Sequence, residues 1–346
     1  MQFSPEKGQL SCGHCGSTQA IPSTKNNLHE RSLNTHQPDY QSLTNTATEE
    51  KQVFGCPNCG ARLTANADVP TITCAFCGTK NINPEARKTR LIEPVGVLPF
   101  RLSREQAADG FKRWIGDDWL APSDLKAGAT PDNFRGIYIP FFTFDAQADS
   151  TWEADAGFYY HVTVPVPDGK GGTVNQQQQR VRWEPRSGSH SAFYDDVLTM
   201  ASRQLANQHE AVAEASSYDL TAVVDYDPRF LLGWEAEVYS IDLPDSTRRA
   251  ETDIRAREVN ACSGKVGGDT QRGLNVSTRL TNLTFKHILL PLWICAYVYK
   301  GKPYRFIING QTGRIAGDRP KSAWKIGLLI AGFLLLVFIL YALAKK

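Results

Sequence analysis

The sequence IGLLIAGFLLLVFILYALA, residues Ile326–Ala344, carries no charged side chain over nineteen residues. As an α-helix rising about 1.5 Å per residue it would extend roughly 28 Å, close to the roughly 30 Å hydrocarbon core of a bilayer. Residue types that favour the membrane interface stand at its two ends: Trp324, Lys325, Tyr341, Lys345 and Lys346. A core helix of a soluble domain rarely lacks a polar face over this length, so we expect a transmembrane helix over residues 324–344.

The composition of the remaining chain is that of a water-soluble protein. The mean hydropathy is negative despite the apolar tail, and the formal net charge of +2 over 346 residues creates no overall field that favours nucleic acid or an acidic partner. The N-terminus, MQFSPEK, lacks the apolar stretch of a signal peptide. Basic residues precede the apolar stretch and favour the cytoplasmic side: Arg314, Arg319, Lys321 and Lys325. We therefore expect a single-pass, tail-anchored protein with its N-terminal bulk in the cytoplasm.

Four cysteines have the spacing of a zinc ribbon. The motif CPNCG (residues 56–60) is followed by CAFCG (residues 74–78). Fourteen residues separate Cys59 from Cys74. Two residues between paired cysteines let both thiolates face one ion, and the glycine after the second cysteine allows the positive φ of a tight knuckle. We expect one structural Zn²⁺, bound by Cys56, Cys59, Cys74 and Cys77 with no position left open to water.

Redox chemistry is the alternative for these cysteine pairs. Six of the eight cysteines form three Cys-x-x-Cys pairs, and in a reducing compartment such pairs more often bind metal than form disulfides. A redox dithiol would be expected within a βαβ pattern, which the surrounding sequence lacks. Metal binding therefore agrees with a cytoplasmic location. Cys262 and Cys295 stand outside these pairs, and we expect them to be buried thiols.

The first cysteine pair, in CGHCG (residues 12–16), has no second pair close to it. Three interpretations stay open. Cys12 and Cys15 could be half of a second ribbon whose first half is missing. They could form a second zinc site completed by His29, His36 or a second chain, or they could be a vestige without metal.

Composition divides the chain into five parts: a partial zinc knuckle at 1–16, a polar linker at 17–52, the zinc ribbon at 53–90, an α+β domain at 91–320 and the transmembrane helix at 324–344. The linker has few apolar residues and is expected to be extended or disordered. Residues 1–95 contain nine Lys or Arg and eight Asp or Glu, a balance of +1. Ribbons that bind nucleic acid usually carry a basic face, so this balance argues against such binding.

The residues between 91 and 320 predict a mainly antiparallel β domain with about three helices. One helix should begin at Ser103, where Gln106 completes a capping box, a second should span 195–215, and a third should begin at Asp245 or Ser246. We expect strands separated by a hairpin near 149–151, by a glutamine-rich loop at 169–179 and by a turn at 300–302. These strands are 136–148, 152–166, 181–193, 233–241, 274–285, 288–299 and 303–308.

Catalytic motifs are absent from this domain. No Gly-x-Ser-x-Gly elbow, phosphate loop or His-Glu-x-x-His motif occurs. Asp195 and Asp196 are adjacent carboxylates, but at the N-terminus of the expected second helix their charge would serve to stabilise the helix. We expect no enzyme.

Several motifs together resemble bacterial membrane-anchored zinc-ribbon proteins of the TFIIB type, whose ribbon is often likened to that of the primosomal replication-restart helicase. The motifs that carry the resemblance are the two ribbon knuckles, VLPF (97–100), GIYIPFFTFD (136–145), YDDVL (194–198), HILLPLW (287–293), NGQTG (309–313) and GDRP (317–320). Members of this family often begin with two ribbons, and residues Phe3–Cys12 resemble the second half of the first one. Its leading cysteine pair is absent here.

The resemblance implies a protein at the bacterial inner (cytoplasmic) membrane that acts together with flotillin-like (SPFH) and phage-shock-type proteins. We therefore expect a non-enzymatic, membrane-tethered adaptor or scaffold for a protein partner. Nucleic-acid binding by a membrane-held ribbon is the alternative. A homo-oligomer is also open, because Gly327 and Ala331 would let two tail helices pack closely.

Overall fold

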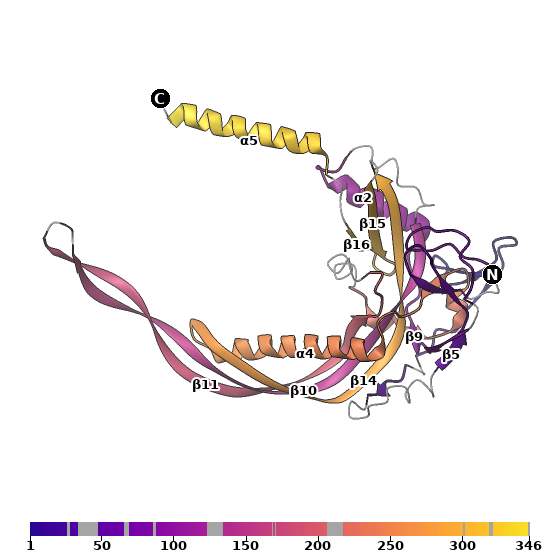
Figure 1. The fold of residues 1–346 in the computed structure, drawn as a ribbon, viewed down its shortest axis with the longest axis horizontal. Coiled ribbons are helices and arrows are strands. Elements are labelled where there is room, and N and C mark those ends of the chain that lie inside the picture. The colour runs from indigo at the N-terminus through magenta and orange to yellow at the C-terminus, as the bar shows by residue number, and fades with distance from the viewer. Residues whose placement is uncertain are drawn as a thin grey trace.

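The computed structural model describes residues 1–25, 28–33, 48–65, 69–85, 88–122, 134–167, 169, 171–205, 217–299, 302–317 and 321–344. They form an α+β fold of mainly antiparallel strands, as expected. Figure 1 shows a crescent: a central body continues at one end into a long curved arm and at the other into the apolar helix α5 (Ala323–Ala344).

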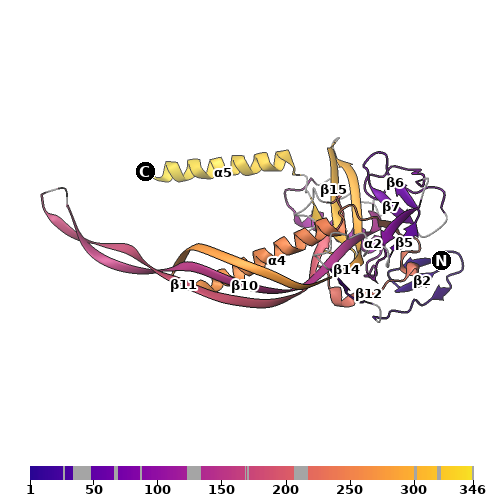
Figure 2. The ribbon, with the colours of Figure 1, turned by 60° about the horizontal axis from the view of Figure 1, so that its bottom comes forward.

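Three long strands build the arm: β10 (Phe134–Pro167), β11 (Thr173–Met200) and β14 (Thr270–Tyr299). β10 lies in the middle and pairs antiparallel with both neighbours. β14 stays beside β10 only as far as Gly157, and the β10–β11 pair then continues alone to Pro167. Register shifts next to Asp145 mark a bulge in both pairings. Bulges bend a strand and increase its twist, in agreement with the curved arm in Figure 2.

The expected strand breaks in this region are wrong. Residues 136–148 and 152–166 belong to one strand, as do 274–285 and 288–299, and the glutamines 176–179 lie within β11 instead of in a loop. Buried polar residues lie at both of these positions. Ser150 hydrogen-bonds Glu258, and His287 hydrogen-bonds the carbonyl of Ile92, so each is satisfied inside the protein and the strand continues through it.

The expected helix at 195–215 is also wrong over residues 195–205. β11 continues to Met200, and the residues after it form bends and turns. Asp196 adopts a φ of 51° beside the bulge, which interrupts a helix as well as a regular strand. Residues 206–216 lie outside the described residues. The expected strand at 233–241 is reduced to β13 (Glu235–Glu237).

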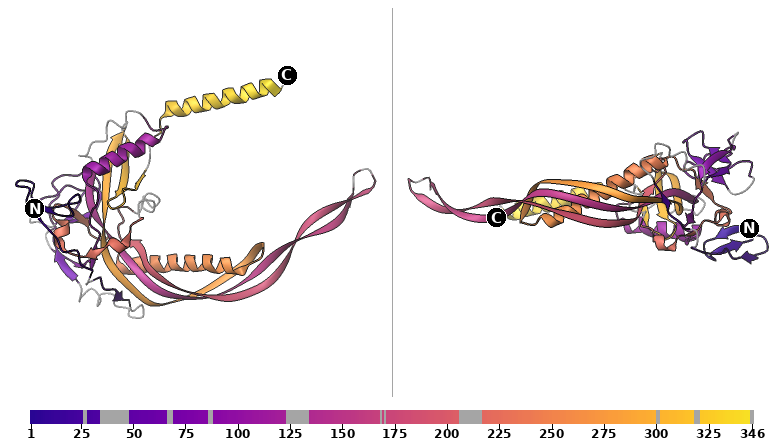
Figure 3. Two further views of the ribbon diagram at one scale, coloured as in Figure 1. Left: turned by 180° about the vertical axis from the view of Figure 1, so that it is seen from behind. Right: turned by 90° about the horizontal axis from the view of Figure 1, so that it is seen from below.

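The other two expected helices are confirmed. α2 (Arg104–Asp117) begins after Ser103 with the predicted capping box, in which Gln106 N donates to Ser103 Oγ and Ser103 N donates to Gln106 Oε1. α4 (Leu243–Val266) begins slightly earlier than expected, with Asp242 as its N-cap. It lies along the concave side of the arm (Figure 3) and packs its buried face against β10, β11 and β14.

The ribbon is continuous with the body sheet. Its strands β6 (Val53–Gly55) and β7 (Arg62–Ala65) extend the sheet through β13 to β10, in the order β10–β13–β7–β6. Short strands complete the structure: β1 (Gln2–Ser4), β2 (Gln9–Ser11), β3 (Thr18–Gln19), β4 (Arg31–Ser32), β5 (Thr48–Lys51), β8 (Thr89–Ile92), β9 (Gly96–Val97), β12 (Val224–Asp225), β15 (Lys302–Asn309) and β16 (Ile315–Gly317). Within the described residues, 3₁₀-helices occur at Leu220–Ala222 and Pro228–Leu231.

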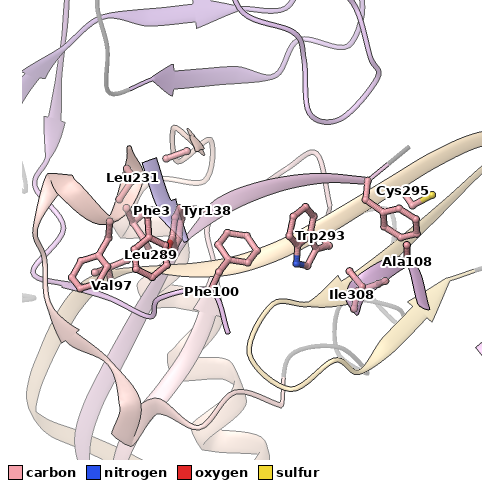
Figure 4. Packing of buried hydrophobic residues seen from close by; sticks show 14 of the residues in the cluster. Phe3, Val97, Phe100, Ala108, Tyr138, Leu231, Leu289, Trp293, Cys295 and Ile308 are labelled. Atoms are coloured by element: carbon pink, nitrogen blue, oxygen red, sulfur yellow. The ribbon is translucent and has the colours of Figure 1, made fainter. Parts of the chain in front are cut away.

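The main core brings together buried residues from the N-terminus to β15, and Figure 4 shows Phe3, Phe100, Trp293 and Ile308 among them. Phe100 stacks on Trp234 with ring centroids 4.3 Å apart and meets Trp293 edge-on at 5.2 Å. Phe3 reaches this core from the N-terminus, and Ile21 from the polar linker is buried in it as well. The linker therefore packs more than its composition suggested, because an extended segment can insert single apolar residues into a core built by other elements. Residues 34–47 of the linker lie outside the described residues.

The tail forms a helix over its whole expected length. Among the described helices, α5 is the one with the length and composition to cross a membrane, and none of its side chains is buried in the protein. Its start is fixed to the body: Ser322 N donates to Leu120 O at 2.8 Å, and Lys325 Nζ donates to the carbonyls of Trp119 and Ala121 at 2.9 and 2.8 Å.

Candidate metal centre

The structure brings the four predicted ribbon cysteines together. The Sγ atoms of Cys56, Cys59, Cys74 and Cys77 all lie within 4.8 Å of one another. Cys56 and Cys77 are separated by 3.5 Å, and Cys59 and Cys74 by 3.6 Å. A tetrahedral zinc ion with Zn–S bonds of about 2.3 Å would hold its sulfurs about 3.8 Å apart. The four thiols therefore fit a zinc ion.

The backbone of both knuckles positions the thiols. Cys56 N donates to Ala61 O at 2.7 Å, and Gly60 N donates back to Cys56 O at 2.9 Å. The second knuckle repeats this pattern around Cys74 and Gly78. Gly60 and Gly78 have φ values of 74° and 75°, the left-handed conformation that glycine adopts without steric cost. The predicted role of these glycines is confirmed.

The pKa values of the ribbon thiols differ from one cysteine to the next. Burial raises the pKa of Cys59 to about 11 and raises the pKa of Cys74 further above its ordinary value. Burial also acts to raise the pKa of Cys77, but hydrogen bonds with Thr79 and Asn58 outweigh it and lower that pKa to about 6. Four thiolates cannot share this space without a positive charge between them, and a metal ion supplies that charge on binding.

The body supports the centre through a residue that sequence reasoning missed. Gln204 Nε2 donates to the carbonyl of Cys59 at 2.9 Å. Gln204 lies just beyond β11, in the segment that was expected to be helical, so no local pattern pointed to it. Arg62 and Glu85 form an ion pair at 3.1 Å across the base of the ribbon.

The N-terminal cysteine pair, unlike the four ribbon cysteines, is not part of a cluster of possible metal ligands among the described residues. Cys12 and Cys15 form a knuckle at the surface, where Cys15 is exposed. Among the described residues, no third cysteine, histidine or carboxylate lies within ligand distance of the pair. His29 is therefore not brought to it, and His36 lies outside the described residues.

Asp195 and Asp196 take part in an acidic cluster at the bulge, not in a helix N-terminus. Carboxylate oxygens of Glu30, Asp145 and Asp195 lie within 4.8 Å of one another. Lys286 Nζ lies 3.2 Å from Glu30 and 2.8 Å from Asp196, so the cluster already contains its own cation. Burial and the nearby carboxyl of Glu30 raise the pKa of Asp145 to about 7.

A buried polar network under α4 was also missed. Glu258 is fully buried and accepts hydrogen bonds from Ser150 at 2.6 Å and Tyr194 at 2.7 Å. His190 Nδ1 lies 2.9 Å from the same carboxylate. Alternating charges along a helix are typical of an exposed face, and only tertiary structure separates Glu258 from the other charged residues of α4. Cys262 and Cys295 are buried, as expected.

A cleft of about 450 Å³ opens where the N-terminal hairpin, the ribbon and α2 meet. Aromatic and charged side chains of both signs line it: Glu6, Arg104, Glu105, Arg135, Trp234, Glu235 and Trp293. Burial raises the pKa of Glu235 to about 7, although the nearby Arg135 acts to lower it. Gly136 leaves room for Trp234, because a Cβ at this position would lie 2.1 Å from the indole ring.

Comparison with known proteins gives one distant relative. The chain is 27% identical over 336 residues to the uncharacterized protein YdjG of Bacillus subtilis (strain 168). The match covers 81% of this chain and 93% of the relative. No family model matches the chain. No solved structure matches it either. The resemblance to TFIIB-type zinc-ribbon proteins therefore stays a prediction from the motifs.

Proposed function

We propose that the chain is a non-enzymatic adaptor or scaffold in which a zinc ribbon and its body are tethered to a membrane and recruit a protein partner. The observation that carries this proposal is that ribbon, body and tail helix are structurally connected to one another. The ribbon shares a sheet with the body through β7 and β13, and the body holds the first turn of α5 through Lys325. A partner bound near the ribbon would therefore be held at a fixed position relative to the tail.

The tail supports a membrane location. Large apolar side chains along α5 are exposed on all sides, and a surface of this kind is stable in hydrocarbon and not in water. We place the chain in the bacterial inner membrane as a single-pass protein with the ribbon in the cytoplasm. A reducing cytoplasm would keep the ribbon cysteines available for zinc.

The cleft between hairpin, ribbon and α2 is the docking site that we favour. Trp234 is partly exposed and offers aromatic surface for apolar side chains, while Arg104, Arg135 and Glu235 can pair with charges of either sign. This mixture of aromatic anchors and polar rim is typical of protein interfaces. By its family resemblance, the partner would be a flotillin-like (SPFH) or phage-shock-type protein.

Site-specific photo-crosslinking in intact cells tests this proposal. A photoreactive amino acid would replace Glu105, which lines the cleft, or Asp109, which lies one turn further along α2 outside the cleft lining. We expect a defined adduct with a flotillin-like or phage-shock-type protein from position 105 and none from position 109. Equal labelling at both positions would contradict docking in the cleft. DNA affinity that falls steeply with salt would instead support the nucleic-acid alternative.

A further inference from the structure

The knuckle at Cys12 and Cys15 has the backbone of a metal-binding knuckle. Cys12 N donates to Ser17 O at 2.9 Å, as Cys56 N does to Ala61 O at 2.7 Å and Cys74 N to Thr79 O at 2.8 Å. Gly16 N donates a hydrogen bond to Cys12 O at 3.0 Å, as the corresponding glycines of the ribbon do to the first cysteine of each pair. The φ of Gly16 is 71°, against 74° and 75° in the ribbon. All three turns therefore present their cysteine pairs in the same way.

This knuckle is held firmly on the body. It sits at the end of the β1–β2–β3 sheet, whose residues Phe3 and Leu10 are buried in the main core. Phe3 N donates to Leu232 O at 2.8 Å, and Trp234 Nε1 donates to Phe3 O at 3.1 Å. A vestigial turn without a role would not need this support, whereas a metal site benefits from ligands fixed in advance.

The site is incomplete and accessible. Structural zinc sites have four protein ligands, and the described part of this chain provides two. A Cβ added to Gly13 or Gly16 would meet no atom within 4 Å, so nothing in the described residues covers the turn. The N-terminal hairpin lies at the outer edge of the body, at the end of the molecule opposite the arm (Figure 3). A second molecule could approach here without contacting the arm.

We propose that Cys12 and Cys15 bind a second zinc ion together with the same two cysteines of a second copy of this chain. A two-fold axis through the ion would bring two identical pairs together and complete a tetrahedral four-cysteine site. The second copy is the simplest occupant because it carries a knuckle of matching geometry. The inference does not depend on the proposed adaptor function, since it rests on the ligand geometry alone.

Zinc content and oligomeric state of the purified full-length chain test this inference together. Zinc would be measured by plasma mass spectrometry, and the molar mass of the protein component by light scattering in detergent. We expect a dimer with about 1.5 zinc ions per chain, one in each ribbon and one shared. The double variant Cys12→Ser/Cys15→Ser should be monomeric with about 1 zinc ion per chain, and the retained ion would show that the ribbon is still folded.

Three outcomes would overturn the inference. About 1 zinc ion per wild-type chain would mean that Cys12 and Cys15 bind no metal. A monomer with about 2 zinc ions per chain would mean that the site is completed within one chain, and loss of the second ion in His36→Ala would identify the ligand. A double serine variant that keeps about 1.5 zinc ions per chain would show that Cys12 and Cys15 do not bind the shared ion. As a second readout, tagged and untagged copies should co-purify in the wild type and not in the double variant.

Discussion

Glu237 and His287 line the same cavity of about 20 Å³ between ribbon and body. Each has a buried polar atom without a hydrogen-bond partner among the described residues: Oε2 of Glu237 and Nε2 of His287. Burial raises the pKa of Glu237 to about 8 and lowers the pKa of His287 to about 3. Both side chains are therefore uncharged at neutral pH, and the interface that holds the ribbon contains a neutral acid beside a neutral base.

This arrangement predicts a pH-dependent stability that Glu237→Gln should reduce. The pKa of Glu237 is higher in the folded than in the unfolded chain, so the folded state binds the proton more tightly. Its contribution is fully present below about pH 4.3, the ordinary pKa of glutamate, and is lost as the pH rises to about 8. The free energy of unfolding should fall by up to roughly 1.4 kcal/mol per pH unit from this group.

Thermal and urea unfolding of wild type and Glu237→Gln between pH 5 and pH 8 would measure this slope. The glutamine variant should have the shallower slope, because its amide stays neutral throughout. Glu50→Gln, on an exposed residue of β5, is the matched control and should keep the wild-type slope. Parallel slopes in wild type and Glu237→Gln would show that Glu237 is ionised in the folded protein at neutral pH.

How far the sequence predicted the structure depends on how many residues along the chain separate the interacting partners. The ribbon was predictable because its four ligands and two glycines lie within 23 residues, from 56 to 78, and their spacing alone fixes the geometry. The α2 cap was predictable for the same reason. The long strands were not, because Ser150 meets a partner 108 residues away in Glu258. A polar residue with a distant buried partner has the same local pattern as a turn.

Removal of the ribbon ligands should unfold the ribbon. The double variant Cys56→Ser/Cys59→Ser is expected to lose about one zinc ion per chain, together with the roughly 10–16 kcal/mol of apparent free energy that such an ion supplies. Leu63 in β7 is completely buried and should become accessible to proteolysis. Metal analysis with limited proteolysis would check both effects, with Cys12→Ser/Cys15→Ser as the control that keeps the ribbon ion. An unchanged zinc content would refute the metal centre.

Glu258 should be important for the attachment of α4 to the arm. Replacing it with alanine leaves Ser150, Tyr194 and His190 without their buried acceptor, and a loss of roughly 3–5 kcal/mol is expected when one partner of a buried charged network is removed. Hydrogen exchange should become faster throughout α4. Asp253→Ala on the exposed face of the same helix should change stability by about 0.5 kcal/mol or less. Equal effects of the two substitutions would contradict a special role of Glu258.

Gly136 should be required for the shape of the cleft. A Cβ in Gly136→Ala would overlap the ring of Trp234, and overpacking of this kind costs roughly 1–3 kcal/mol. We expect a changed near-ultraviolet circular dichroism signal and weaker crosslinking from position 105. Gly264→Ala on α4, where the new methyl group meets open space, should keep the wild-type spectrum and crosslinking. A Gly136→Ala variant with unaltered spectrum and stability would show that Trp234 can move away freely.

The central claim is that the body recruits its partner at a membrane by means of α5, and the most direct measurement is the location of the adduct crosslinked through position 105. Cell fractionation after irradiation would compare the wild-type tail with Leu334→Arg/Leu335→Arg, which places two charges in the middle of α5. The account predicts that the adduct sediments with membranes and resists alkaline extraction only when the tail is apolar. A membrane-bound adduct that is equally abundant with the charged tail, or a wild-type adduct found in the soluble fraction, would contradict it.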